Sequence, residues 1–291
     1  MGVYHFLSYP DGKRKALTLS YDDGCNQDKP LIELLDRYGI RCTFNLFSDI
    51  FDRKDRWTPE EALQVYGNGL HEVAIHLAHH TAPGKVPLTF TAREIGEDRK
   101  RLEALFGRVI PGMAYPDTGI IRMTDGRTVG EVETCLSTMG ILYARTTRDQ
   151  TERDRFRLPQ DFLAWDPTCR HANPDLMTYA QQFLDWDIGG RYISDQDPLL
   201  FYLWGHSREF DASGNWDLME GFCRLMGNRD DIWYATNLEI YRYVTAYRRL
   251  EFSFDDTFVY NPSAIPVWFR KNETLFLVPA GETVPCFLLH P

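Results

Sequence analysis

The sequence lacks the cysteine patterns of a disulfide-stapled domain or a zinc ribbon. Its six cysteines are irregularly spaced and form no CxxC pair, whereas small disulfide frameworks and structural zinc sites depend on closely or regularly spaced cysteines. We therefore expect free thiols and a reducing compartment for Cys25, Cys42, Cys135, Cys169, Cys223 and Cys286.

Long apolar runs and basic runs are also missing. The first fifteen residues contain no apolar stretch of signal-peptide length, and no later segment approaches the roughly 20 apolar residues of a membrane span. Lys and Arg form no cluster, and a net charge of -10 would repel a phosphate backbone. These absences predict a cytoplasmic protein that binds neither nucleic acid nor membrane, and they leave its oligomeric state open.

What the sequence does contain is an alternation of short β-rich runs with capped, amphipathic segments. Residues 15–21 alternate apolar and polar positions, and Asp28 with Pro30 then opens a helix that ends at Gly39. The same reasoning predicts further strands at 41–47, 71–75, 111–115, 141–147, 162–165, 199–205 and 232–236, helices opened by Thr58, Thr91 and Asn173, and a last helix over about 238–249.

Seven or eight successive strand–helix units favour a (β/α) barrel over an open doubly wound sheet. With 43% hydrophobic residues the chain can bury a large core, and barrels reach 291 residues as one domain. From about residue 251 short β runs follow one another without helices. We therefore expect an α/β fold in which residues 1–250 form a distorted seven- or eight-stranded (β/α) barrel and residues 251–291 form a small antiparallel β appendage docked on it.

Polar clusters directly follow several of the predicted strands, which is where (β/α) barrels carry their chemistry. They are SYDDG at 20–24, HLAHH at 76–80, YPDTG at 115–119 and a single histidine, His206, after residues 199–205. Each cluster alone is commonly a turn or a solvated pair of side chains. Their conjunction at strand ends is what indicates a functional site.

The first two clusters predict a metal site. Two histidines four residues apart on a helical turn can direct their ring nitrogens at one ion, so we expect His76 and His80 to bind a metal together with Asp23. Three protein ligands leave a position open for water, as in catalytic sites, and this set of ligands favours a divalent ion, zinc above others. The adjacent Asp22 would then act as the base that takes a proton from water.

These clusters resemble the motifs of the polysaccharide deacetylases, the NodB-homology domain of carbohydrate esterase family 4, over roughly residues 15–210. The resemblance implies a distorted (β/α) barrel, a divalent metal and a carbohydrate substrate from which acetyl groups are hydrolysed. It implies that His206 protonates the leaving group and that Leu203 and Trp204 form the pocket for the acetyl methyl group. By the same resemblance a backbone N–H near Asp117 helps to stabilise the oxyanion, and substrate contacts come from Tyr115, Pro116 and Asp117.

Departures from the family pattern mark an atypical member. Ala114 stands where the family has an arginine beside the base, and we hypothesise that Arg145 takes its place. The family's Asp-Trp motif, which orients the late histidine, is not plain; we prefer Asp166, at a predicted strand end, over Asp185. Asp117 follows Pro116 where an aromatic residue is common, so the substrate should not be copied from the family.

Two other functions stay open at this point. One is a cyclic-amide hydrolase on the same fold, and the other is a non-catalytic carbohydrate-binding homologue, which the missing arginine would suit. A barrel glycosidase is disfavoured because Asp22 and Asp23 are adjacent in sequence and cannot flank a glycosidic bond from opposite sides.

Overall fold

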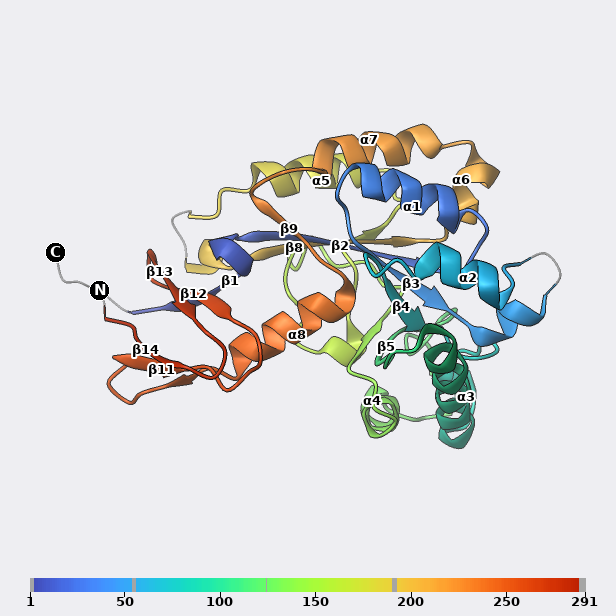
Figure 1. Ribbon diagram of the computed structural model, residues 1–291, viewed down its shortest axis with the longest axis horizontal. Coiled ribbons are helices and arrows are strands. Elements are labelled where there is room, and N and C mark those ends of the chain that lie inside the picture. The colour runs from blue at the N-terminus through green and yellow to red at the C-terminus, as the bar shows by residue number, and fades with distance from the viewer. Residues whose placement is uncertain (1–2, 54–55, 124, 190–192, 288–291) are drawn as a thin grey trace.

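A parallel β-sheet that forms part of a barrel is the centre of the computed structural model, which describes residues 3–53, 56–123, 125–189 and 193–287 (Figure 1). The strands are paired in the order β6-β5-β4-β3-β2-β8-β7. On the edge of β2 opposite β8, the first residues of β2 pair with β9 and the last ones pair with β3. This arrangement confirms the predicted (β/α) barrel. The strands are β2 (Lys15–Asp22), β3 (Cys42–Leu46), β4 (Glu72–Ile75), β5 (Gly112–Ala114), β6 (Tyr143–Arg145), β7 (Cys169–Arg170), β8 (Leu199–Gly205) and β9 (Ile232–Tyr234).

Helices cover the outside of this sheet, and one helix packs on its inner face. Alternate residues of a strand point to opposite faces, so Leu17 and Leu19 of β2 join the outer core, whereas Ala16 joins an inner core with Ile240 and Val244 of α8. The helices are α1 (Asp28–Arg37), α2 (Pro59–Tyr66), α3 (Leu88–Phe106), α4 (Val129–Thr138), α5 (Leu176–Asp185), α6 (Arg208–Ser213), α7 (Trp216–Met226) and α8 (Asn237–Arg248).

Some predicted element boundaries were wrong. Helix α3 begins at Leu88, directly after Pro87, and not at Thr91; α5 begins at Leu176, after the predicted cap at Asn173. Residues 162–164 form a short 3₁₀ helix instead of a strand, because the Asp161 side chain accepts a hydrogen bond from the Leu163 N–H. Trp165 then makes a single β-bridge to Arg145 at the end of β6.

The barrel wall is not a continuous ladder between its two edge strands, β6 and β7. The Trp165 N–H donates to the Ala144 carbonyl beside β6, and the Thr168 N–H donates to the Tyr202 carbonyl of β8. The chain therefore crosses from one edge of the sheet to the other over residues 165–168. The segment that precedes this crossing, residues 146–161, contains turns and bends only.

The predicted appendage consists of two three-stranded antiparallel sheets, β1-β12-β13 and β10-β11-β14 (Figure 1). Strand β1 (His5–Ser8) precedes the barrel in sequence but pairs with β12 (Val267–Lys271). The Tyr243 hydroxyl of α8 donates to the Ser8 carbonyl and accepts from the Trp268 N–H, which ties the sheet to the barrel. The division at residue 250 stays a proposal. The other strands are β10 (Glu251–Phe252), β11 (Phe258–Tyr260), β13 (Thr274–Val278) and β14 (Thr283–Pro285).

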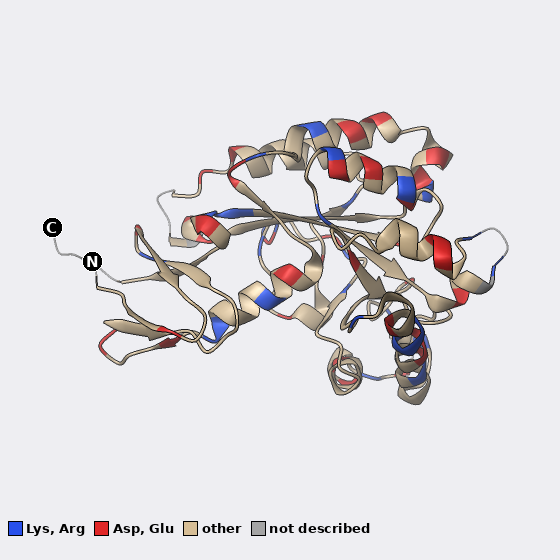
Figure 2. Ribbon diagram, viewed as in Figure 1, with Lys and Arg blue, Asp and Glu red and all other residues tan. Residues whose placement is uncertain are grey.

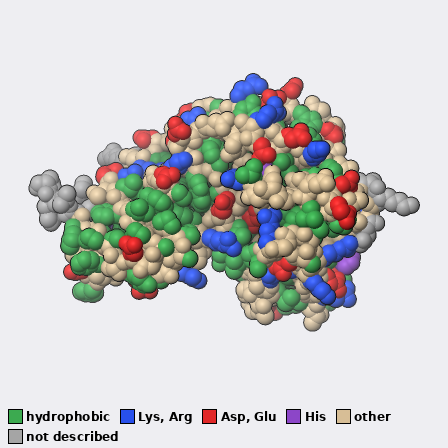
Figure 3. All heavy atoms as spheres, viewed as in Figure 1, with side chains coloured by type: hydrophobic (Ala, Val, Ile, Leu, Met, Phe, Trp, Pro, Cys, Tyr) green, Lys and Arg blue, Asp and Glu red, His purple; other side chains and the backbone are tan. Residues whose placement is uncertain are grey.

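The surface is mixed in charge over the barrel and more apolar over the appendage. Figure 2 shows that acidic and basic residues alternate along α1, α3 and α7. Figure 3 shows apolar side chains gathered over the appendage, where Phe258, Leu275 and Leu277 are exposed. Among the described residues, no helix has the length and hydrophobicity needed to cross a bilayer.

Candidate functional site

Eight of the twelve predicted site residues line one cavity of about 520 Å3 at the carboxyl ends of the parallel strands. Asp22 lies six residues after Ala16 of β2, whose side chain faces the barrel interior, and His206 lies four residues after the inward-facing Tyr202 of β8. Residues separated by an even number of positions along a strand face the same side. Strand periodicity therefore directs both side chains into the barrel. The predicted residues that line the cavity are Asp22, Asp23, His76, His80, Tyr115, Asp117, Trp204 and His206.

Asp23, His76 and His80 converge on one point. The Nε2 atoms of His76 and His80 lie 3.6 Å and 3.4 Å from Oδ1 of Asp23, and one ligand atom from each of the three residues lies within 4.8 Å of the others. Oδ1 of Asp23 is buried and finds no hydrogen-bond partner among the described residues. A buried carboxylate oxygen without a partner is costly, and a divalent ion at this point would satisfy it.

His76 is also held in the form that binds metals. The Nδ1 atom of His76 lies 2.9 Å from the Ala114 carbonyl oxygen, which can only accept, so Nδ1 carries the proton and Nε2 is left free. Burial lowers the pKa of His76, which favours the neutral ring. The neighbouring His79 turns away from the site, and its Nδ1 lies 2.8 Å from Oε1 of Glu94.

Residues 76–80 do not form the predicted helical turn but an irregular turn. Asp23, Leu77, His80 and Asp117 all have positive φ angles, between 49° and 76°. Residues with a Cβ rarely adopt this region, and such strain clusters at functional sites. The turn nevertheless brings the rings of His76 and His80 together, with centroids 4.8 Å apart.

Arg145 holds the carboxylate of Asp22, as hypothesised. Its Nη2 lies 2.6 Å from Oδ1 of Asp22 and also contacts Oδ2, and both side chains are almost fully buried. Arg145 is the register partner of Ala114 in the β5–β6 pair, so the guanidinium comes from the next strand at the same level. Burial would raise the pKa of Asp22, but Arg145, His76 and His206 outweigh it and lower that pKa.

A glutamate that was not predicted lies beside His206. Nδ1 of His206 lies 3.0 Å from Oε1 of Glu209, and Arg170 contacts the same oxygen. His171 approaches the other oxygen of Glu209 at 3.0 Å. Burial would raise the pKa of Glu209, but His171, His206 and Arg170 outweigh it, so this carboxylate stays ionised beside His206.

The structure places Asp166 away from His206, so the prediction that Asp166 orients this histidine was wrong. Asp166 accepts hydrogen bonds from Arg148 and from the Thr146 hydroxyl, and it lies outside the cavity that contains His206. Trp165, which bridges the end of β6, has its side chain in the inner core, so the side chain of the next residue, Asp166, points away from the barrel interior. The alternative, Asp185, is the last residue of α5 and is also absent from the cavity lining.

Glu209→Gln is expected to lower kcat of the hydrolysis proposed below by roughly 10–100-fold, because a neutral amide holds the His206 ring and its proton less well. Asp166→Asn is the matched control and should change kcat by less than about 2-fold. Both would be measured as initial rates at saturating substrate. Equal losses in the two variants would contradict this assignment of Glu209.

Two of the predicted substrate contacts are placed differently. Leu203 precedes Trp204 in β8, so strand periodicity turns its side chain to the outer face, where it packs under the helices. It cannot line the acetyl pocket. Trp204 does line the cavity, with Arg145 and Arg170 stacked on its ring at 4.4 Å and 5.3 Å. Pro116 is buried and is not among the residues that line the cavity.

Four residues that line the cavity were not among the predicted site residues: Thr147, Asp149, Arg170 and Arg208. Arg208 contacts Oδ2 of Asp23 and so leaves Oδ1 for an ion. Its place two residues after His206, at the start of α6, was the available signal. Asp149 follows β6 at a distance of four residues and had no such signal.

Comparisons with known proteins agree with the motifs and the fold. Residues 10–125 match the family model for polysaccharide deacetylases. None of the curated protein sequences compared matches the chain.

Three solved structures share the barrel. A Mycobacterium smegmatis protein assigned to the polysaccharide deacetylases is 18% identical, with a TM-score of 0.57 over 83% of this chain and 94% of that one. Puue allantoinase is 14% identical, with a TM-score of 0.56 over 80% and 91%. A variant of the peptidoglycan deacetylase PdaC from Bacillus subtilis is 14% identical, with a TM-score of 0.50 over 81% and 93%.

Identities this low establish a shared fold and not a shared substrate. The family model covers the part of the chain that carries SYDDG and HLAHH. The resemblance seen in the motifs is thus confirmed: residues 10–125 carry the sequence pattern of the polysaccharide deacetylase family, and the chain has the barrel fold of its members.

Proposed function

We propose that this protein is a metal-dependent hydrolase that removes acetyl groups from an amino sugar or an acetylated polysaccharide. The observation that carries the proposal is the buried Oδ1 of Asp23, which has no hydrogen-bond partner among the described residues and faces the Nε2 atoms of His76 and His80. A second carboxylate and a third histidine lie close by. Oδ2 of Asp22 lies 3.9 Å from Nε2 of His76, and Nε2 of His206 lies 3.9 Å from Oδ2 of Asp23 and 4.0 Å from Oδ2 of Asp22. Together they supply ligands, a base and an acid.

Asp23, His76 and His80 would hold the ion, and mixed nitrogen and oxygen ligands favour zinc. When bound, a divalent ion polarises the acetyl carbonyl and lowers the pKa of water. Arg208 would keep Asp23 to a single coordinating oxygen, because it occupies Oδ2. The hydrogen bond from His76 to the Ala114 carbonyl would fix the orientation of that ring.

Asp22 and His206 would divide the proton transfers between them. Asp22, kept ionised by Arg145, takes a proton from the attacking water. His206 then donates a proton to the leaving nitrogen or oxygen as the tetrahedral intermediate collapses, while Glu209 balances its positive charge. The Trp204 ring would border the acetyl group, and the backbone N–H near Asp117 is the proposed second oxyanion donor.

Metal removal tests the proposal most directly. We expect treatment with a chelator to abolish acetate release from acetylated chitooligosaccharides, peptidoglycan fragments or acetylated xylans, and added zinc to restore it. His80→Ala should lower both bound metal, measured by elemental analysis, and activity by at least about 10-fold. His79→Ala is the matched control from the same turn, and both quantities should stay near the wild-type values.

Three results would overturn the proposal. Full-rate acetate release by metal-free protein would exclude the metal mechanism. Hydrolysis of cyclic amides without acetate release from any acetylated sugar would favour the cyclic-amide alternative. Binding of carbohydrate without hydrolysis of either substrate class would favour a non-catalytic homologue.

A further inference from the structure

His171 is a buried histidine with no part in the proton transfers proposed above. It directly follows β7, and its side chain is 1% exposed. Its backbone N–H donates to the Trp204 carbonyl at 2.8 Å, so the residue lies beside the end of β8, next to His206. It does not line the cavity that contains the candidate metal ligands.

Three neighbours fix the position of the His171 ring. The ring packs on Phe210 of α6 and on Tyr21 of β2, with ring centroids 4.4 Å and 5.6 Å apart. A Cβ atom on Gly205, the last residue of β8, would lie 2.1 Å from Nδ1 of His171, far inside van der Waals contact. Glycine at this position is what allows the ring to lie directly against β8, one residue before His206.

Both nitrogens of this ring face buried polar groups. Nδ1 lies 3.2 Å from the Tyr21 hydroxyl, and Nε2 lies 3.0 Å from Oε2 of Glu209. The contact to Glu209 is off-line for a hydrogen bond, but neither atom has another hydrogen-bond partner among the described residues. Burial lowers the pKa of His171, although Glu209 opposes this, and so favours the neutral ring. Because an ionised carboxylate only accepts, the one proton of that ring belongs on Nε2.

Glu209 therefore has a separate contact on each of its two oxygens. Oε1 is shared by Nδ1 of His206, at 3.0 Å, and by the guanidinium of Arg170. A carboxylate held at one oxygen can still turn about its last torsion, which has broad minima. The contact of His171 with Oε2 restricts this rotation, and so it sets the plane in which Glu209 meets the His206 ring.

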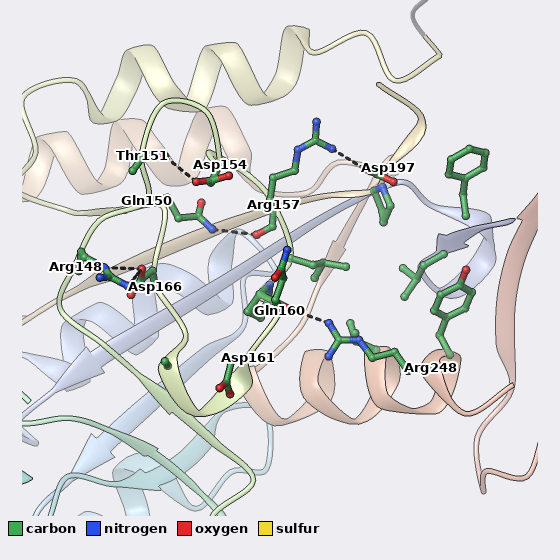
Figure 4. A pocket seen from close by; sticks show the side chains of 18 of the residues that line it. Arg148, Gln150, Thr151, Asp154, Arg157, Gln160, Asp161, Asp166, Asp197 and Arg248 are labelled. Atoms are coloured by element: carbon green, nitrogen blue, oxygen red, sulfur yellow. Dashed lines mark hydrogen bonds and ion pairs between the residues drawn. The ribbon is translucent and has the colours of Figure 1, made fainter. Parts of the chain in front are cut away.

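The orientation of His206 depends on this glutamate. Nδ1 of His206 has two contacts, Glu209 at 3.0 Å and Arg170 at 3.4 Å, and a guanidinium can only donate. The proton on Nδ1 is therefore held by Glu209. Asp166, which the sequence suggested for this role, is paired elsewhere: Figure 4 shows it with Arg148 of the segment that follows β6, at 2.8 Å.

We propose that His171 is a positioning residue that acts on His206 through Glu209. It holds Oε2 of the glutamate, so that Oε1 keeps the His206 ring protonated at Nδ1 and turned with Nε2 toward Asp22 and Asp23. His171 itself neither gives up nor takes up a proton. The inference rests on the proposed function, in which His206 protonates the leaving group, and it makes His171 matter most where that group cannot leave without a proton.

Substrates with different leaving groups test this role. We expect His171→Leu to lower kcat for acetate release from N-acetylglucosamine oligomers by roughly 10-fold, the low end for outer contacts, and to leave KM within about 2-fold. The rate with 4-nitrophenyl acetate should fall far less, because 4-nitrophenolate leaves without a proton, so the ratio of amide to ester rates should drop by about 5-fold or more. His171→Gln keeps an N–H donor for Glu209 and should recover most of the amide activity.

His71→Leu is the matched control for a purely structural effect. His71 is also a buried histidine, and its ring nitrogens contact the Cys42 N–H and Asp36. It precedes β4, at the opposite end of the sheet from the site, so its replacement should lower stability without changing the ratio of amide to ester rates. A fall of both rates in the same proportion in His171→Leu, or no fall in either, would overturn the proposal.

Nitrogen-15 NMR of the full chain with zinc present separates this proposal from the hydrolytic one, because it needs no turnover. At a pH at which the ring is neutral, the ring-nitrogen shifts of His206, identified by their loss in His206→Ala, report which nitrogen carries the proton. We expect Nδ1–H to dominate in the wild type and in His71→Leu, and a mixture of tautomers in His171→Leu. An unchanged tautomer in His171→Leu would overturn the proposal even if acetate is released, and the expected mixture would support it even if no substrate is hydrolysed.

Discussion

Asp22→Asn is expected to lower kcat for acetate release by about 10²–10⁴-fold, the usual contribution of a general base. The asparagine keeps the size of the side chain and can still bond to Asn45, whose Nδ2 lies 2.8 Å from Oδ1 of Asp22. It can no longer accept the proton of the attacking water. Because Asp22 is not among the three proposed ligands, the bound metal should stay near the wild-type stoichiometry.

Asp23→Asn provides the contrast to this variant. It should lower activity together with bound metal, since it removes the charge of the one carboxylate ligand. Initial rates and elemental analysis on the same preparations distinguish the two outcomes. If Asp22→Asn lost the metal, or if Asp23→Asn kept both metal and activity, the roles assigned to the adjacent aspartates would be wrong.

Arg145→Met is expected to have the largest effect on stability, a loss of about 3–5 kcal/mol in the free energy of unfolding. The Arg145 and Asp22 side chains are 0% and 1% exposed, so removal of the guanidinium leaves a carboxylate buried without its cation. The desolvation cost of that charge is then no longer offset. Denaturant unfolding followed by circular dichroism would measure the loss.

The double variant Arg145→Met, Asp22→Asn tests this explanation. With both charges removed, most of the lost stability should return, because replacing a buried ion pair by neutral groups costs little. Activity should not return in the double variant, since the base is absent. Additive losses of stability would instead show that Arg145 acts mainly by packing on Trp204, whose ring lies 4.4 Å from the guanidinium.

The sequence predicted the strands of the barrel better than the partners of its site residues. A buried parallel strand such as residues 199–205 has a clear signal, because nearly every position is apolar. The metal ligands were also predictable, because they follow such strands directly. Arg145 could be predicted because the end of one strand lies beside the end of the next.

The errors have physical causes. Leu203 was placed in the pocket by resemblance, although the two-residue period of a strand excludes it if Trp204 faces inward. Asp166 was preferred because a strand was expected at 162–165, where a side-chain cap forms a 3₁₀ turn instead. Glu209 had a usable signal, since residues three apart at the start of a helix lie on one side, as His206 and Glu209 do.

The pairing of β1 with β12 has a consequence for how the chain folds during synthesis. Residues 5–8 leave the ribosome early, but their partners at 268–271 follow only after the whole barrel. At ~5–20 residues per second, β1 waits roughly 15–50 s for its neighbour. Closing so long a loop is slow unless the barrel has already brought its ends together. We therefore expect the barrel to fold first and the sheet β1-β12-β13 to form last, after the core of the barrel has packed.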